Sequence, residues 1–291
     1  MASARACYTV AMVRIAIVGD IHGHWSPEDV DQLDHLAYDA VVVVGDLAGL
    51  RFAPTLGVAR GLAQLTTRTI VVPGNHDATH PAQLLAEVTG APRLGDPLAT
   101  AQARRLDTLK TALGPCELGA YSLHRIGEIT LVAARPHSMG GPTLSFAAHL
   151  HAVWGIDSLE ASARRLCALV DEAPTEHLVF VGHNGPTGLG DRRDDIWGCD
   201  FRRAEGDWGD ADLRAAIDHA RETGRRVAAV CAGHMHRRVR GGGQRTAQRR
   251  QDGTLYVNAA EVPRVREGRR HHVALELLDG PARATDRWVA P

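Results

Sequence analysis

The sequence predicts a mixed α/β domain, in which helices flank one central β-sheet or two packed sheets. Two features of the chain predict it. Short apolar runs recur and end in glycine followed by a polar residue, and helical patterns lie between them. The five runs with this ending are residues 13–18, 40–44, 69–72, 178–181 and 227–232.

These five runs are predicted to form buried strands. Each has four to six residues, is rich in Val and Ile, and stops at a glycine turn. Their apolar character is continuous, so we expect both faces of the sheet to be covered. Further strands are predicted at residues 128–134, 255–259 and 272–278.

Two helices have clear start signals. Ser26 precedes Pro27, which predicts a helix capped by serine with proline in its first turn. Asp210 is predicted to cap a later helix that ends at Gly224. Residues 78–119 are helical in pattern, and we expect them to form an insertion or cap over the site.

Length favours one domain. The chain has 291 residues, enough for a large domain with a substantial core. We expect this single domain to span residues 12–291, after an N-terminal extension of residues 1–11.

Charge, hydropathy and cysteine content indicate which binding partners and which compartment to expect. The formal net charge is −1, so no overall field favours nucleic acid or an anionic membrane. No apolar run approaches the ~20 residues of a membrane helix, and the N-terminus has no signal-peptide pattern. The five cysteines are scattered, so we expect reduced thiols in a cytoplasmic protein. The oligomeric state stays open.

Polar residues follow the five runs directly. In extended chain, residues two apart lie on the same side, so Asp20 with His22 and His234 with His236 are each expected to point into one cleft. Ligand sites of α/β folds lie at the carboxyl ends of the strands. The residues in these positions are Asp20, His22, Asp46, Asn75, His76, Asp77, His183, His234 and His236.

This set of donors indicates two metal ions. Two aspartates, one asparagine and four histidines, leaving His76 and Asp77 aside, are too many for one tetrahedral zinc ion. They suit two cations that share a bridging carboxylate. Because the donors are nitrogen and oxygen only, Mn, Fe, Co or Zn is favoured over a thiolate site.

Five short blocks occur in a fixed order along residues 13–236: GDIHG (19–23), GDL (45–47), GNHD (74–77), GH (182–183) and GHMH (233–236). In this the chain resembles the calcineurin-like metallophosphoesterase superfamily of binuclear metal phosphoesterases. The resemblance implies a four-layer sandwich of two central mixed β-sheets flanked by helices, with the late strands in the second sheet. It also implies two divalent metal ions, Mn, Fe or Zn.

The resemblance further implies a role for each residue. His76 would face the scissile ester as an acid or a phosphate-binding group, and Asp77 would orient His76. Asp46 would bridge the metals. The first metal would be held by Asp20, His22 and His236, and the second by Asn75, His183 and His234.

The function implied is hydrolysis of a phosphate ester by a metal-bridging hydroxide, and we expect a small-molecule phosphate monoester as substrate. A phosphodiester, such as a cyclic nucleotide, is the alternative, and a non-catalytic protein-binding scaffold is a third. The family's Ser/Thr protein phosphatases have Glu in place of Asp77 and Asp-Arg-Gly after the second block. This chain reads Leu-Ala-Gly-Leu-Arg at residues 47–51, which weakens that interpretation.

Several arginines near the ligands are candidates to bind the substrate's phosphate: Arg51, Arg192, Arg193, Arg237 and Arg238. For Arg192 and Arg193, a solvated loop with internal ion pairs is an equal alternative. The arginine-rich segment 237–253 is predicted to be a mobile hairpin loop, and His271 and His272 to lie on the surface. His137, His149 and His151 fit no pattern.

Overall fold

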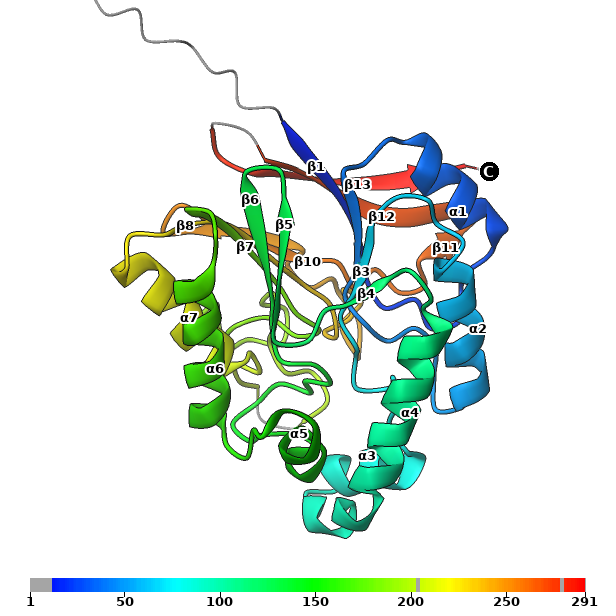
Figure 1. The fold of residues 1–291 in the computed structure, drawn as a ribbon, viewed down its shortest axis with the longest axis vertical. Helices are drawn as coiled ribbons and strands as arrows, with labels where there is room; N and C mark the ends of the chain where they lie inside the picture. The colour runs from blue at the N-terminus through cyan, green and yellow to red at the C-terminus, as the bar shows by residue number, and fades with distance from the viewer. Residues whose placement is uncertain (1–11, 203–204, 278–279, 291) are drawn as a thin grey trace, which may run out of the picture.

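The computed structural model describes residues 12–202, 205–277 and 280–290, which form two β-sheets packed face to face between helices (Figure 1). The predicted four-layer α/β sandwich of two mixed sheets is confirmed. The predicted N-terminal extension, residues 1–11, and the last residue of the predicted strand 272–278 lie outside the described residues.

The first sheet has the strand order β11-β12-β1-β2-β3-β4, with β13 paired to β12. Strands β1 to β4 are parallel, whereas β12 is antiparallel to both β1 and β13. The bounds are β1 (Val13–Val18), β2 (Ala40–Val43), β3 (Thr69–Val71), β4 (Glu117–Leu118), β11 (Val265–Arg266), β12 (Arg269–Leu277) and β13 (Arg283–Val289).

The second sheet has the order β5-β6-β7-β8-β10-β9. Its inner strands β6, β7, β8 and β10 are parallel, and β5 and β9 are antiparallel edge strands. The bounds are β5 (Ser122–Ile126), β6 (Ile129–Ala133), β7 (His177–Val181), β8 (Arg226–Ala232), β9 (Gln248–Gln251) and β10 (Thr254–Asn258).

The core explains why the strands read as continuous apolar runs. In β1, Ile15 and Ile17 face the second sheet, where they join the cluster that includes Val179. Ala16 and Val18 face the other way, toward helices. With both faces buried, every position of the strand except Arg14 is apolar.

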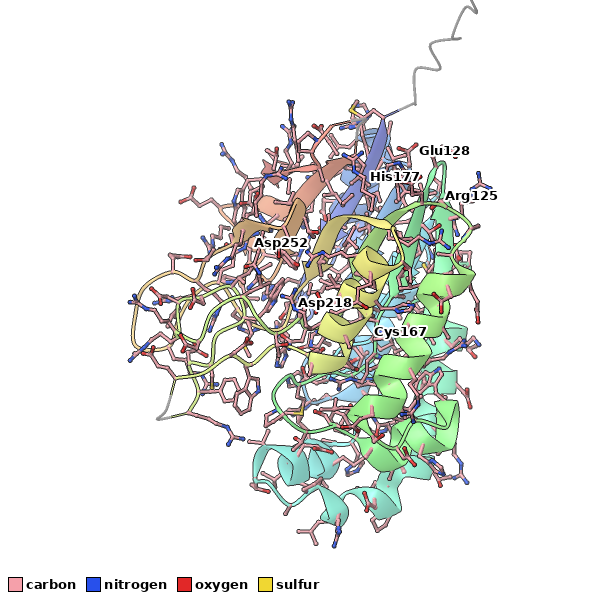
Figure 2. All side chains as sticks on the ribbon, turned by 90° about the vertical axis from the view of Figure 1, so that its left-hand side faces the viewer. Arg125, Glu128, Cys167, His177, Asp218 and Asp252 are labelled. Atoms are coloured by element: carbon pink, nitrogen blue, oxygen red, sulfur yellow. The ribbon has the colours of Figure 1, made fainter. Side chains whose placement is uncertain are left out.

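Helices cover the two outer faces. The first sheet packs against α1, α2 and α4, and the second against α6 and α7, which lie side by side (Figure 2). In the described residues no helix is long and apolar enough to cross a membrane. The helices are α1 (Pro27–His35), α2 (Phe52–Leu62), α3 (Pro81–Val88), α4 (Ala99–Ala112), α5 (Ala147–Trp154), α6 (Leu159–Glu172) and α7 (Ala211–Glu222), with short 3₁₀ turns at Pro92–Leu94 and Asp96–Leu98.

Both predicted helix starts are found, but the caps differ. At α1, the backbone N–H of Ser26 donates to Asp29 Oδ2 at 3.0 Å, as in a capping box. At α7, Asp210 occupies the cap position, yet its side chain makes no cap hydrogen bond. Its carboxylate is instead engaged by Arg135 and Ser138.

Two predictions about the late segments are wrong. The arginine-rich segment ends in β9, which pairs with β10, and within it Arg245 is 3% exposed. His271 and His272 are buried, because β12 is an interior strand of the first sheet. His272 Nε2 lies 2.8 Å from the Tyr38 hydroxyl.

Candidate active site

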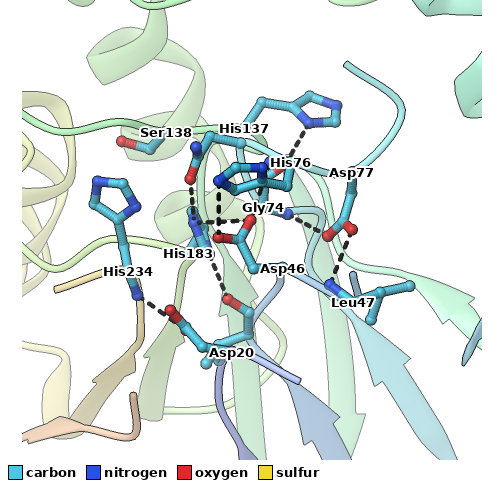
Figure 3. Close-up of polar contacts among 12 residues, drawn as sticks. Asp20, Asp46, Leu47, Gly74, His76, Asp77, His137, Ser138, His183 and His234 are labelled. Carbon is cyan, nitrogen blue, oxygen red and sulfur yellow. Dashed lines mark hydrogen bonds and ion pairs between the residues drawn. The ribbon is translucent and has the colours of Figure 1, made fainter. Parts of the chain in front are cut away.

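The predicted ligand residues converge where strands of both sheets end. Figure 3 shows Asp20, Asp46, His183 and His234 among them. Strands β1, β2 and β3 of the first sheet and β7 and β8 of the second each deliver at least one of them. In the described residues, the ligand atoms form two groups. Within each group, all ligand atoms lie within 4.8 Å of one another. The groups are Asp20 with His22 and His236, and Asp46 with His183 and His234.

The pairs Asp20/His22 and His234/His236 reach the site differently than predicted. Extended chain was expected, but Asp20, His22 and His234 have positive φ angles of 41°, 47° and 65°. Asp46 has a φ of 51°. Left-handed backbone at non-glycine residues is strained and gathers at functional sites. Tight turns, not strand alternation, therefore aim these side chains.

Glycines before the ligands allow the loops to approach closely. Gly45 has a φ of 97°, and a Cβ there would lie 2.6 Å from the backbone nitrogen of Gly74. At Gly233 a Cβ would lie 2.2 Å from Asp20 Oδ1. A side chain at either position would push apart the loops that carry the ligands.

The first ligand set is Asp20, His22 and His236. The Nε2 atoms of His22 and His236 face each other at 3.1 Å, and His236 Nε2 lies 3.2 Å from Asp20 Oδ2. In the part of the chain that the structure describes, Asp20 Oδ2 is buried and has no hydrogen-bond partner. An orphaned carboxylate oxygen beside two imidazole nitrogens fits a bound cation.

The second ligand set is Asn75, His183 and His234. His183 Nδ1 donates to the carbonyl of Val44 at 2.7 Å, which leaves the lone pair on Nε2. That Nε2 lies 2.9 Å from Asn75 Oδ1, and the rings of His183 and His234 are 5.0 Å apart. These nitrogen and oxygen donors fit a second cation.

Asp46 lies between the two sets. Its Oδ1 is 3.5 Å from His183 Nε2 of the second set, and its Oδ2 is 4.0 Å from His22 Nε2 of the first. Oδ1 also accepts a hydrogen bond from the backbone of His76 at 3.0 Å. This is the placement expected of a bridging carboxylate.

The charges of the site suit cation binding. Burial opposes ionisation of Asp20 and Asp46, but the surrounding histidines outweigh it and hold the pKa of both carboxyls below its usual range. Burial is the main cause that lowers the pKa of His234 to about 3. Ionised carboxylates and a neutral imidazole are the forms that bind metals.

His76 and Asp77 occupy different surroundings. His76 is 24% exposed, and its Nε2 lies 3.9 Å from Asp46 Oδ2. Asp77 was expected to orient His76, but His76 Nδ1 has no hydrogen-bond partner within residues 12–202, 205–277 and 280–290. The carboxylate of Asp77 accepts hydrogen bonds from the backbone of Leu47 and Gly74, both at 2.9 Å. It thus joins the loops after β2 and β3.

The candidate arginines differ in placement. Arg51 is exposed at the start of α2, and in the described residues its guanidinium makes no ion pair. Arg192 pairs with Asp194 at 3.4 Å and Arg193 with Glu205 at 2.8 Å, which matches a solvated loop with internal ion pairs.

The two arginines that follow His236 differ from each other in burial. Arg237 is buried, and its guanidinium donates to Asn258 O and Asp286. This fixes the guanidinium as a structural group. Arg238 is exposed.

The sequence interpretation missed the residues that follow β6. Arg135, His137 and Ser138 are buried and contact loops that carry ligands. The same signal was present, because these polar residues come directly after an apolar run at residues 128–134. What was missing is the glycine that marks the other blocks.

Comparisons with solved structures support the fold. A dimetal phosphatase from Danio rerio aligns with a TM-score of 0.56 at 13% identity, covering 97% of this chain and 98% of that one. A second structure gives 0.56 at 12% identity, covering 94% and 99%. An archaeal phosphodiesterase aligns with a TM-score of 0.42 at 13% identity, covering 94% of this chain and 100% of that one.

Sequence comparison gives the family. No match is found among curated proteins. The family model described as calcineurin-like phosphoesterase matches residues 13–238, a span that holds every predicted ligand. Since this is more than half of the chain, and since the five blocks lie at the ends of the strands, the chain belongs to the calcineurin-like phosphoesterase family.

Proposed function

We propose that this chain is a metal-dependent phosphoesterase that hydrolyses a phosphate monoester of a small molecule. One observation carries the proposal: two ligand sets meet at Asp46, whose oxygens lie 3.5 Å from His183 Nε2 and 4.0 Å from His22 Nε2. Two divalent cations so held would supply an activated water and neutralise charge on the phosphoryl group.

The exposed histidines define the side from which substrate arrives. The side chains of His22, His76 and His236 are 23%, 24% and 42% exposed. We assign to His76 Nε2, which faces Asp46, the proton given to the leaving oxygen or the hydrogen bond to the phosphoryl group. In this proposal Asp77 acts indirectly, by holding the loop that carries His76.

A monoester is favoured over a diester by charge. A monoester dianion needs more positive donors than a diester, and Arg51 stands exposed on the loop that follows Asp46. A diester needs a surface for its second arm, and aromatic residues make up only 4% of the chain.

The test is a comparison of esters on the metal-loaded protein. We expect about two transition-metal ions per chain by elemental analysis. The manganese-loaded protein should hydrolyse p-nitrophenyl phosphate faster than bis-p-nitrophenyl phosphate, and a panel of phosphorylated metabolites should then identify the substrate. Faster diester hydrolysis would overturn the monoester assignment. Two bound ions without hydrolysis of any ester would favour a protein-binding scaffold.

A further inference from the structure

The loop that follows β6 contributes no metal ligand, yet it contacts the loops that carry the second ligand set. We call residues 135–138 the brace loop. Arg135, His137 and Ser138 within it are at most 1% exposed. Polar side chains buried this completely are normally held by specific partners, and their partners lie on the loop after β3 and at the N-terminus of α7.

His137 holds the turn before Asn75. Its backbone N–H donates to Pro73 O at 2.8 Å, and its Nδ1 donates to Gly74 O at 2.8 Å (Figure 3). The next residue, Asn75, places its Oδ1 2.9 Å from His183 Nε2. One imidazole therefore fixes the peptide group that joins Gly74 to a ligand.

The protonation state of His137 suits this role. Burial and the neighbouring His149 lower the pKa of His137 to about 3, so its ring is neutral at physiological pH. A neutral imidazole has one N–H. Because a carbonyl only accepts, that proton is on Nδ1. His137 Nε2 is buried and has no hydrogen-bond partner among the described residues, so within that part of the chain the contact with Gly74 is the ring's one hydrogen bond.

The other end of the brace loop is anchored beside His183. Arg135 Nη2 and Ser138 Oγ donate to Asp210 Oδ1 at 2.8 and 2.6 Å, and Arg135 Nε donates to Asp212 at 2.8 Å. The backbone N–H of Asp210 donates to the carbonyl of Gly185, two residues after His183, at 2.7 Å. The brace loop thus joins the two segments that supply Asn75 and His183.

Little free space remains around the turn that His137 holds. A Cβ on Gly74 would lie 2.3 Å from Asp46 Oδ1 and 2.7 Å from His183 Cε1. A rotation of this peptide would therefore move Asn75 and press on two other ligands.

We propose that His137 is a positioning residue for the second metal, acting through the Gly74 carbonyl to hold Asn75 beside His183. The inference rests on the proposed binuclear site. It predicts an asymmetry, because the brace loop contacts the segments of the second set, whereas Asp20, His22 and His236 come from other loops.

The experiment compares two substitutions of His137 by metal binding. His137→Phe keeps a ring but removes the donor, and His137→Asn keeps a short N–H donor. Asparagine also tolerates the positive φ of 59° at this position. Cobalt titration followed by visible absorption is done in wild type and in a His22→Ala background, where the first set is impaired and the second is measured.

We expect His137→Phe to weaken the second site by roughly 10–100-fold, the usual effect of losing an outer partner of a ligand, and to leave the first site near wild type. His137→Asn should recover most of the affinity. His272→Phe is the matched control, because it removes another buried, hydrogen-bonded histidine, on β12. It should change thermal stability without changing either metal affinity.

The outcomes separate this inference from the proposed function. Wild type that binds fewer than two ions would refute the binuclear site, and this inference with it. Wild type that binds two ions, with His137→Phe keeping both or weakening both equally, would overturn only the role of His137. The same holds if His137→Asn behaves like His137→Phe.

Discussion

The two ligand sets differ in their exposure to solvent. In the first set, the side chains of His22 and His236 are 23% and 42% exposed. In the second set His183 is fully buried and Asn75 is buried, while His234 is partly exposed. His183 is also fixed by the carbonyl of Val44, whereas His22 and His236 contact each other. We infer that the second set anchors a metal, and that the first set meets the substrate and exchanges its metal more readily.

The largest effect should come from Asp46, where the two sets meet. Asp46→Asn removes the anionic bridge, so both metals should be lost. Activity should fall by more than the roughly 10²–10⁴-fold expected for a missing acid or base. Elemental analysis of the purified variant measures the metal loss directly. If one ion stays bound at full occupancy, Asp46 belongs to a single set and the bridge is refuted.

The ligands could be predicted from the sequence because each lies in a short block after an apolar strand. Those strands can be recognised in the sequence because both of their faces are buried, which makes them nearly continuous apolar runs, as in β1 and β7. The blocks also identify which residue types meet. The turns that aim them could not be predicted, because left-handed backbone at Asp20 and His22 is a property of the folded loops.

The contacts around the ligands could not be predicted, for a different reason. Asp77 binds the amides of Leu47 and Gly74, and His137 binds the carbonyl of Gly74, 63 positions away. A hydrogen bond to backbone places no demand on the residue type of its partner. Only the three-dimensional arrangement reveals such a partner.

The next effect concerns His76, which belongs to neither set in our assignment. His76→Ala should slow turnover by roughly 10²–10⁴-fold, because a positioned proton donor is lost. Metal content should stay near two ions per chain, since Asp46 and both sets are intact. A measured loss of one ion in this variant would mean that His76 is a metal ligand and belongs to one of the two sets.

Chelation should separate the two sets in time. On addition of EDTA, the first metal should leave at least about tenfold faster than the second, equivalent to ~1.4 kcal/mol in barrier, because its histidines face solvent. Stopped-flow release into a metal indicator measures both phases. His22→Ala should abolish the fast phase and leave the slow one. A single phase with an amplitude of two ions would contradict the difference inferred here.

The smallest effects should come from the arginines, and they test which loop faces the substrate beside the first set. Arg51 is exposed, and its guanidinium makes no ion pair with a described residue. Arg51→Ala should therefore lower kcat/KM for the monoester by roughly tenfold, mainly through KM, because a charge-assisted contact to phosphate is lost.

Arg192 and Arg193 have 74% and 55% exposed side chains and acidic partners of their own. Replacing either by Ala should change kcat/KM by less than about twofold, as for other exposed ion pairs, which makes them matched controls for Arg51. A larger loss at Arg192 or Arg193 than at Arg51 would place the phosphate-binding arginine on the loop after His183, beside the second set.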